Sequence, residues 1–171
     1  MKNKIGFFGG SFNPPSKTHI SLAKKLLKEK TIDKVIFVPV GDFYNKQELI
    51  QAKHRYNMLK IATEELGNVE VSDIEMHINK KLYAADIFEL IEKEHNNSEN
   101  YYIMGADNYN KMHMWKDYEE IKNKYKYIVL ERNKKDISST NIRNMIKNNL
   151  NTSDVLDENV LKYIQKNQLY I

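Results

Sequence analysis

Short apolar runs of strand length alternate along this chain with longer stretches whose apolar residues recur at helical spacing. This alternation is typical of a parallel β-sheet whose strands are joined by helices that cover its two faces. VIFVPV is apolar throughout, and so is KIGFF after its first lysine, as expected of strands buried on both sides. The predicted strands are 4–8, 35–40, 68–74, 101–105 and 125–131, and the predicted helices are about 16–30, 53–66, 85–95, 139–149 and 156–166.

Five strands with crossover helices predict an α/β fold with a doubly wound parallel sheet, followed by a short C-terminal helical segment over about 139–171. The length of 171 residues fits one such domain and leaves no room for a second core of full size. Ligands of doubly wound sheets bind beyond the carboxyl ends of the strands. Four segments that follow predicted strands are therefore candidates for a site: 9–19, 41–46, 105–115 and 132–143.

The composition excludes several kinds of chemistry. The chain has no cysteine, which rules out disulfides, thiolate metal sites and cysteine nucleophiles. The net charge is +4, but the lysines are spread along the whole chain among asparagines. Proteins that bind nucleic acid usually concentrate their charge on one face. No apolar run reaches the roughly 18–20 residues of a membrane span, so we expect a cytoplasmic protein that binds neither nucleic acid nor membrane.

The segment GGSFNPPSKTH, residues 9–19, carries groups that suit a phosphate site. Gly9 and Gly10 let the backbone approach a ligand closely. Ser16 begins a predicted helix, and the first amides of a helix bind anions because they lack partners and lie at the positive end of the dipole. Ser16 and His19 share a face of the first turn. Alone, this pair would be an N-cap and a packing histidine; the glycines and prolines before it favour the phosphate site.

A second anion-binding helix start is predicted at DISSTNIRNMI, residues 136–146. Ser138, Ser139 and Thr140 run into the helix, and Arg143 lies one turn further on. Hydroxyls, free amides and a guanidinium at one place would hold a phosphate group. The alternative is a capping serine and a solvated arginine. Together, the two segments predict a polyphosphate held between two helix starts.

Other common catalytic motifs are missing from the sequence. It has no P-loop lysine motif and no Gly-x-Gly-x-x-Gly of dinucleotide-binding proteins. It also has neither a plausible Ser-His-Asp elbow nor a His-Glu-x-x-His zinc site. Hydrolysis by a protein nucleophile or a zinc ion therefore has little support, and we expect no metal-binding residues.

These motifs resemble those of a known group of enzymes, the nucleotidyltransferase superfamily. GGSFNPPSKTH resembles its (His/Thr)-x-x-His loop, and ISSTNIR resembles its Ile-Ser-Ser-Thr-x-x-Arg motif. Between them, MGADNYNKMHMW is similar to the Gly-x-Asp…Trp segment of the nicotinate-nucleotide adenylyltransferase family. KHRYNML, KLYAADIFELI and VLKYIQKNQLY also resemble stretches of this family, so the likeness covers nearly the whole chain.

The resemblance implies a single Rossmann-like domain over 1–171, a monomer or small homo-oligomer, that moves AMP from ATP to nicotinate mononucleotide. It implies that His19 and Ser16 act at the α/β-phosphates and Arg143 at the β/γ-phosphates, with Mg²⁺ carried on the ATP phosphates. Asp107 would lie near a ribose. The implied ATP-binding residues are Gly9, Gly10, Ser11, Phe12, Gly105, Asp107, Ser138, Ser139 and Thr140, and the implied mononucleotide-binding residues are Lys46, Tyr83, Ala84 and Trp115.

The sequence departs from the family pattern at three positions. Ser16 stands where the bacterial enzymes carry their first histidine, Thr18 where a glycine is usual, and Ala84 where a threonine follows the tyrosine. Related adenylyltransferases have threonine at the first of these positions, so a hydroxyl there is compatible with activity. The alternatives left open are nicotinamide mononucleotide or phosphopantetheine as the acceptor, a non-catalytic nucleotide-binding module, and a basic RNA-associated protein.

Overall fold

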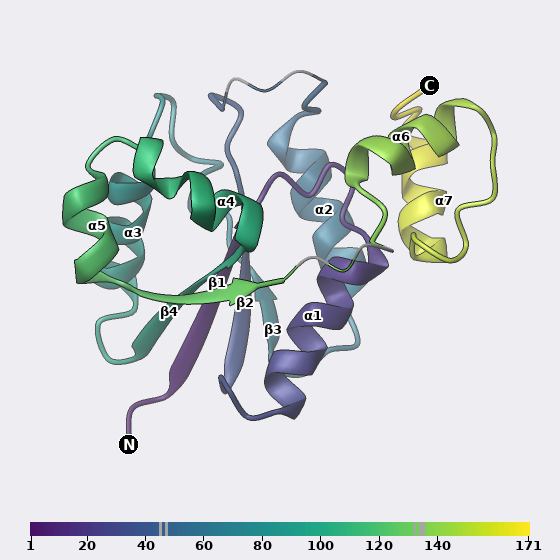
Figure 1. The fold of residues 1–171 in the computed structure, drawn as a ribbon. Coiled ribbons are helices and arrows are strands. Elements are labelled where there is room, and N and C mark those ends of the chain that lie inside the picture. Colours follow the sequence, from purple (N-terminus) through teal and green to yellow (C-terminus); the bar gives the residue numbers. More distant parts are fainter. Residues whose placement is uncertain (45, 47, 132, 134–135) are drawn as a thin grey trace.

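The computed structural model of this chain describes residues 1–171 apart from 45, 47, 132, 134 and 135. Within the described residues, five parallel strands form one sheet in the order β3-β2-β1-β4-β5 (Figure 1). The predicted doubly wound α/β fold is confirmed. The strands are β1 (Lys4–Gly10), β2 (Lys34–Pro39), β3 (Val69–Val71), β4 (Glu99–Gly105) and β5 (Lys126–Leu130).

Helices connect these strands and cover both faces of the sheet. In Figure 1, α1 and α2 lie on one side of the sheet, α3 and α5 lie on the other, and α6 and α7 stand beyond α2 as a C-terminal pair. In the described part of the chain, no helix combines the length and the apolar character that crossing a bilayer would need. The helices are α1 (Lys17–Lys28), α2 (Ala52–Thr63), α3 (Ala84–Glu94), α4 (Ala106–Lys111), the 3₁₀ helix η1 (Met112–Met114), α5 (Tyr118–Lys124), α6 (Ser139–Lys147) and α7 (Glu158–Lys166).

The side chains of β1 show how the two faces are filled. Successive residues of a strand point to opposite faces, so Phe7 packs with Phe88 and Ile91 of α3. Its neighbour Phe8 packs with Leu26 of α1 and with α2 on the other face. Both faces of the central strands are therefore buried, which explains why their sequences are apolar without alternation.

A third apolar cluster joins the C-terminal helices to the rest of the protein. Met58 of α2 packs against Ile142 of α6 and against Val160 and Ile164 of α7, and all four side chains are buried. This packing brings the beginning of α6 close to the segment that follows β1 (Figure 1).

Three segments differ from the sequence prediction. One is the helix α5 (Tyr118–Lys124), where no element was predicted; Ile121 is its one buried residue. The strand predicted over 68–74 covers only Val69–Val71, because β3 is an edge strand that pairs with β2 over three residues. The segment 105–115, predicted as a loop, contains α4 and η1. None of the six residues of α4 is buried, so no apolar periodicity marks this helix in the sequence.

The strand order also fixes where a ligand can enter. β1 lies between β2 and β4, so the chain leaves β1 toward one face of the sheet and leaves β4 toward the other. A crevice at the carboxyl ends of such neighbouring strands is the usual ligand site of doubly wound folds. A ligand site is therefore expected among the segments that follow β1, β2 and β4.

Candidate active site

The segment between β1 and α1 folds back over the end of the strand. Phe12 has a left-handed φ of 46° and is buried against the rings of Phe8 and Phe37. A Cβ atom at Gly10 would lie 2.9 Å from the Phe12 ring, so the glycine makes room for this fold-back. A cis peptide bond joins Asn13 to Pro14, and the chain then enters α1 at Ser16.

Ser16 and His19 form a capping box at the start of α1. The backbone N–H of Ser16 donates to Nδ1 of His19 at 2.9 Å, and the Ser16 hydroxyl lies 2.9 Å from the same atom. Because Nδ1 accepts a hydrogen bond from a backbone N–H, the neutral ring carries its own proton on Nε2, which makes Nε2 a donor. The ring also meets Phe12 edge-on, with 5.2 Å between ring centroids. Ser16 therefore fixes both the helix start and the tautomer of His19.

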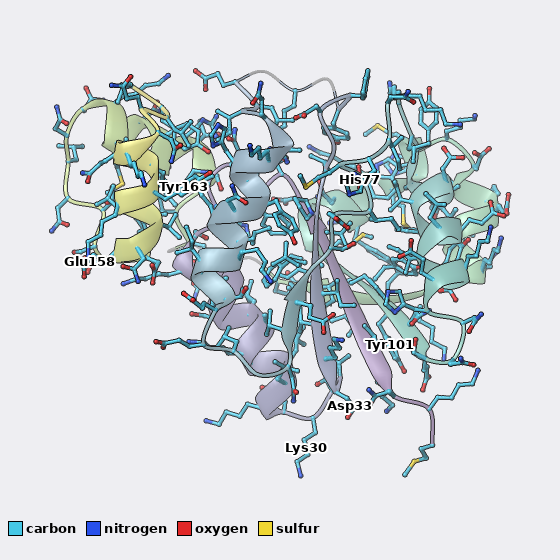
Figure 2. All side chains as sticks on the ribbon, turned by 180° about the vertical axis from the view of Figure 1, so that it is seen from behind. Lys30, Asp33, His77, Tyr101, Glu158 and Tyr163 are labelled. Carbon is cyan, nitrogen blue, oxygen red and sulfur yellow. The ribbon has the colours of Figure 1, made fainter. Side chains whose placement is uncertain are left out.

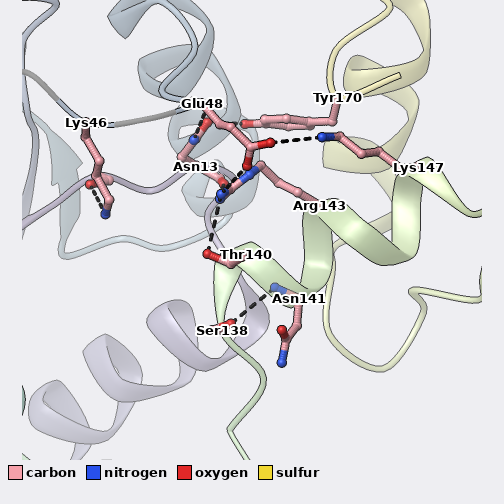
Figure 3. A network of polar contacts seen from close by, with 10 residues as sticks. Asn13, Lys46, Glu48, Ser138, Thr140, Asn141, Arg143, Lys147 and Tyr170 are labelled. Carbon is pink, nitrogen blue, oxygen red and sulfur yellow. Dashed lines mark hydrogen bonds and ion pairs between the residues drawn. The ribbon is translucent and has the colours of Figure 1, made fainter.

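The beginning of α6 contacts this same segment (Figure 3). The Nη1 group of Arg143 donates to the carbonyl of Asn13 at 2.9 Å, and the Ser139 hydroxyl donates to the carbonyl of Pro14 at 2.9 Å. Ser138 caps α6, its hydroxyl accepting from a backbone N–H of the first turn. The starts of α1 and α6 thus lie beside each other, although the residues in contact are more than 120 positions apart in the sequence.

A carboxylate that the sequence analysis missed is bound to Arg143. Nη2 of Arg143 lies 3.0 Å from Oε2 of Glu48, and Nζ of Lys147 lies 3.1 Å from Oε1 (Figure 3). The same Nη2 also lies 3.4 Å from the hydroxyl of Thr140. The hydrogen bonds from Arg143 and Lys147 lower the pKa of Glu48. An exposed anion is therefore already held where the sequence predicts that a phosphate binds.

Lys46 and Arg55 hold the residue that follows β1. Nζ of Lys46 donates to the hydroxyl of Ser11 at 3.0 Å, and Nη1 of Arg55 donates to the carbonyl of Ser11 at 3.0 Å. Arg55 comes from α2 and is completely buried. Partial burial, together with the nearby charges of Arg143 and Arg55, lowers the pKa of Lys46. These contacts complete what we call the phosphate half of the site: residues 9–19, Lys46, Glu48, Arg55 and the beginning of α6.

Residues 80–84 and 105–116 lie on the other side of β1 (Figure 1), and we call them the acceptor half because Tyr83, Ala84 and Trp115 are the predicted mononucleotide-binding residues among them. This region also contains Gly105 and Asp107, which are predicted to bind ATP. Tyr83 occupies the N-cap position of α3, where its backbone N–H donates to the carboxylate of Asp86. The ammonium of Lys116 lies 4.7 Å from the centroid of the Tyr83 ring. Ala84 and Trp115 both pack, partly buried, against the apolar cluster under α3. The structure therefore brings Tyr83, Ala84 and Trp115 into one region. Lys46 contacts Ser11 in the phosphate half, and its predicted role at the mononucleotide phosphate stays a prediction.

The remaining predicted residues lie at strand ends. Gly9 and Gly10 end β1, and Gly105 ends β4 and is the N-cap of α4. Asp107 is exposed in the first turn of α4. Among the described residues, no group of three or more histidine, aspartate or glutamate side chains is placed to hold a metal ion.

Comparison with known proteins decides the family. Residues 7–145 match the family model described as cytidylyltransferase-like. The chain belongs to this family. It is also 34% identical over 185 residues to the "Probable nicotinate-nucleotide adenylyltransferase" of Acholeplasma laidlawii. The aligned region covers 95% of each chain. The protein of the same name from Clostridium tetani is 34% identical over 200 residues, covering 99% of this chain and 100% of the relative.

Within the cytidylyltransferase-like proteins, the chain is a member of the nicotinate-nucleotide adenylyltransferases, so the predicted family is confirmed. The fold agrees. The structure of Plasmodium falciparum nicotinic acid mononucleotide adenylyltransferase complexed with NaAD matches with a TM-score of 0.80 at 21% identity. That match covers 98% of this chain and 97% of the other.

The sequence motifs do not predict the contacts of two residues: Glu48, which binds Arg143, and Arg55, which binds Ser11. Glu48 lies two residues beyond the predicted site segment 41–46, and Arg55 lies inside KHRYNML, which resembles the family but predicted no role for the arginine. The contacts of both residues are set by tertiary packing across 44 to 95 positions. For Arg55, one signal was present: an arginine on a helix that is otherwise largely apolar on its sheet-facing side.

Proposed function

We propose that this nucleotidyltransferase moves the adenylyl group of ATP to nicotinate mononucleotide, forming nicotinate adenine dinucleotide and pyrophosphate. The observation that carries the proposal is the contact between the two helix starts, in which Arg143 and Ser139 donate to the carbonyls of Asn13 and Pro14. Two positive helix ends beside each other suit a triphosphate better than a single phosphate.

The reaction needs no covalent enzyme intermediate. A phosphate oxygen of the mononucleotide attacks the α-phosphorus of ATP, and the bond from that phosphorus to the oxygen bridging the β-phosphorus breaks. The protein's part is to align these atoms and to stabilise charge on the departing pyrophosphate. His19 suits the second task, because its Nδ1 is held by Ser16 and its Nε2 is the donor. We assign Ser16 the task of holding His19, since its side chain is buried in the capping box.

Arg143 and its neighbours suit the β- and γ-phosphates. Nη1 of Arg143 stays on the carbonyl of Asn13, while a phosphate oxygen replaces the Glu48 carboxylate at Nη2. Exchange of one anion for another leaves the guanidinium neutralised throughout. Mg²⁺ arrives as part of the substrate on the ATP phosphates, where it keeps several of its waters.

The acceptor half suits a pyridine mononucleotide. Trp115 offers a ring on which the pyridine can stack. Tyr83 and Ala84, together with the first amides of α3, would border the bound pyridine. The exposed ammonium groups of Lys116 and Lys81, which lie 4.7 and 5.2 Å from the centroid of the Tyr83 ring, add positive charge beside an acceptor that carries a phosphate and a carboxylate.

Pyrophosphate release tests the proposal directly. The purified chain is incubated with ATP, Mg²⁺ and one acceptor at a time: nicotinate mononucleotide, nicotinamide mononucleotide or phosphopantetheine. We expect release with the first, accompanied by the adenine dinucleotide product, and much slower release with the other two. If ATP binds and no acceptor gives pyrophosphate, the chain is a nucleotide-binding module and the proposal is wrong.

A further inference from the structure

The last residues of the chain return to the phosphate half of the site. After α7 ends, Leu169 and Tyr170 turn back into the protein, and both are buried. The hydroxyl of Tyr170 donates to Oδ1 of Asn13 at 2.7 Å (Figure 3). Tyr170 is 8% exposed and Asn13 is 3% exposed, so this contact is sealed from water on both sides. Burial raises the pKa of Tyr170, which keeps its hydroxyl protonated as a donor.

Two other polar groups of Asn13 are held as well. Its carbonyl accepts from Arg143, and its Nδ2 donates to the backbone carbonyl of Glu48 at 2.9 Å. Because that carbonyl can only accept, the side-chain amide of Asn13 must face it with nitrogen and face Tyr170 with oxygen. Three distant segments, those of Glu48, Arg143 and Tyr170, therefore meet at one buried residue, and each contact depends on the orientation set by the others.

The position of Asn13 determines the position of the proposed catalytic groups. Only two prolines separate it from Ser16, so a shift of Asn13 is passed on to Ser16 and to the His19 ring that Ser16 holds. Arg143 would lose its carbonyl partner in the same shift. Prolines have little freedom to absorb such a movement, because their φ angles are fixed by the ring.

We propose that Tyr170 is a positioning residue for adenylyl transfer: its hydroxyl orients Asn13 and thereby the segment that carries Ser16 and His19. This inference rests on the proposed function for its catalytic readout. The alternative is that the hydroxyl only fastens the end of the chain to the body of the protein.

The chain offers a matched control for that alternative in Tyr163 of α7. The Tyr163 hydroxyl accepts from Nδ2 of Asn57 at 3.0 Å and lies 3.0 Å from Nδ1 of His54, both on α2. Figure 2 shows Tyr163 between α7 and α2. Both tyrosines thus fasten the C-terminal segment through a hydroxyl, but these Tyr163 contacts lie on α2 and the Tyr170 contact lies on the proposed phosphate segment.

The experiment compares Tyr170→Phe with Tyr163→Phe at a temperature well below the melting temperature of each variant. We expect Tyr170→Phe to lower kcat/KM for ATP about tenfold or more, because catalysis is sensitive to small misplacements of the reacting groups. Tyr163→Phe should leave kcat and both KM values near those of the wild type. Equal effects of the two variants on kcat/KM, or an unchanged Tyr170→Phe enzyme, would overturn the proposal.

Two further measurements test the role of Tyr170 through ATP binding, independently of whether any acceptor is turned over. Calorimetric binding of Mg·ATP should weaken in Tyr170→Phe and not in Tyr163→Phe, and this readout holds even if none of the acceptors is turned over. In an Asn13→Ala background, Tyr170→Phe should have no additional effect on that affinity, since the partner of the hydroxyl is gone. An undiminished additional effect in that background would contradict action through Asn13.

Discussion

The phosphate half and the acceptor half of the site are held in place by different forces. In the phosphate half, Asn13, Arg55 and Arg143 are buried and hydrogen-bonded to segments far away in the sequence. In the acceptor half, Tyr83 is 40% exposed, and α4 buries none of its residues. Buried polar networks lose much of their stability when one member is lost, whereas exposed elements tolerate exchange.

This contrast matches what each half must do in the proposed reaction. ATP is the adenylyl donor of the proposed reaction whichever acceptor binds, so a preorganised site for its phosphates can be rigid. The acceptor differs from one reaction to another, and it meets short elements that rest mainly on apolar packing. The change to Ala84 lies in the acceptor half, where a substitution disturbs no buried hydrogen bond that the structure describes.

The strongest test of the phosphate half is the removal of His19. His19→Ala should lower kcat about 10²-fold or more, the usual cost of losing one donor to charge that develops in the transition state. The measurement is steady-state pyrophosphate release, with a thermal unfolding curve to show that the variant is folded.

His77→Ala is the matched control for this variant. The exposed ring of His77 pairs with Asp73 at the surface, and no role in the reaction is assigned to it. We expect His77→Ala to keep the wild-type kcat. A His19→Ala enzyme as active as the His77→Ala enzyme would show that His19 only caps α1.

Removal of Trp115 should affect the acceptor and spare ATP. Trp115→Ala should raise KM for the mononucleotide about tenfold, the factor that corresponds to a stacking contact of about 1.4 kcal/mol. The KM for ATP should stay within about twofold of the wild-type value, because the phosphate half is held by hydrogen bonds of other residues. Trp115→Phe, which keeps an aromatic face, serves as the control and should recover most of the affinity. Equal increases in both KM values would break the distinction between the two halves.

The sequence alone predicts much of this architecture because its signals are local. The apolar runs at 4–8 and 35–40 mark buried strands, and the rule that parallel strands gather their carboxyl ends at one edge predicts that GGSFNPPSKTH and ISSTNIR approach each other. The contacts of Ser139 and Arg143 with Pro14 and Asn13 fit that rule. The specific roles of these residues in catalysis stay predictions.

The parts that the sequence does not predict depend on distant tertiary contacts. Glu48 meets Arg143 across 95 positions, Arg55 meets Ser11 across 44, and Tyr170 meets Asn13 across 157. No periodicity or motif links such pairs, because each contact exists only after elements far apart in the sequence have packed together. The short helix α4 was missed for a different reason, since it presents no buried face to set a pattern.

Replacement of Glu48 tests whether its carboxylate competes with the phosphates of ATP for Arg143 and Lys147. Glu48→Gln keeps the shape of the side chain and removes its charge, so Arg143 and Lys147 should release it more readily to an incoming phosphate. We expect KM for ATP to fall about threefold, a change of well under 1.4 kcal/mol, with KM for the mononucleotide unchanged. Steady-state kinetics at two salt concentrations measure this effect.

Glu158→Gln is the matched control for Glu48→Gln. Glu158 forms an exposed ion pair with Lys162 within α7 and should leave both KM values unchanged. A rise in KM for ATP in Glu48→Gln would show that Glu48 supports the site instead of competing for it.

The smallest effect is expected where the loops after β2 and β3 meet, at Glu75. Its carboxylate accepts from the backbone N–H of Gly41 at 3.0 Å, and burial raises the pKa of Glu75. A raised pKa means that the folded state binds the proton more tightly than the unfolded state. The stability from this group is therefore present below the ordinary glutamate range and is lost as the pH rises through the folded pKa. Glu75→Gln, which cannot ionise, should be slightly more stable than the wild type at pH 8, where the buried wild-type carboxylate carries its charge.

The pH dependence of this difference distinguishes ionisation from packing. Urea unfolding at pH 8, 6 and 4.5 should show the advantage of Glu75→Gln shrinking as the pH falls, because the wild-type carboxyl then becomes protonated. Asp73→Asn should give the opposite sign, since the hydrogen bond from His77 lowers the pKa of Asp73 and favours its charged form. A difference for Glu75→Gln that is constant with pH would mean that packing, not charge, separates the two proteins. In that case the contact between Gly41 and Glu75 would fasten the loops after β2 and β3 without any electrostatic cost.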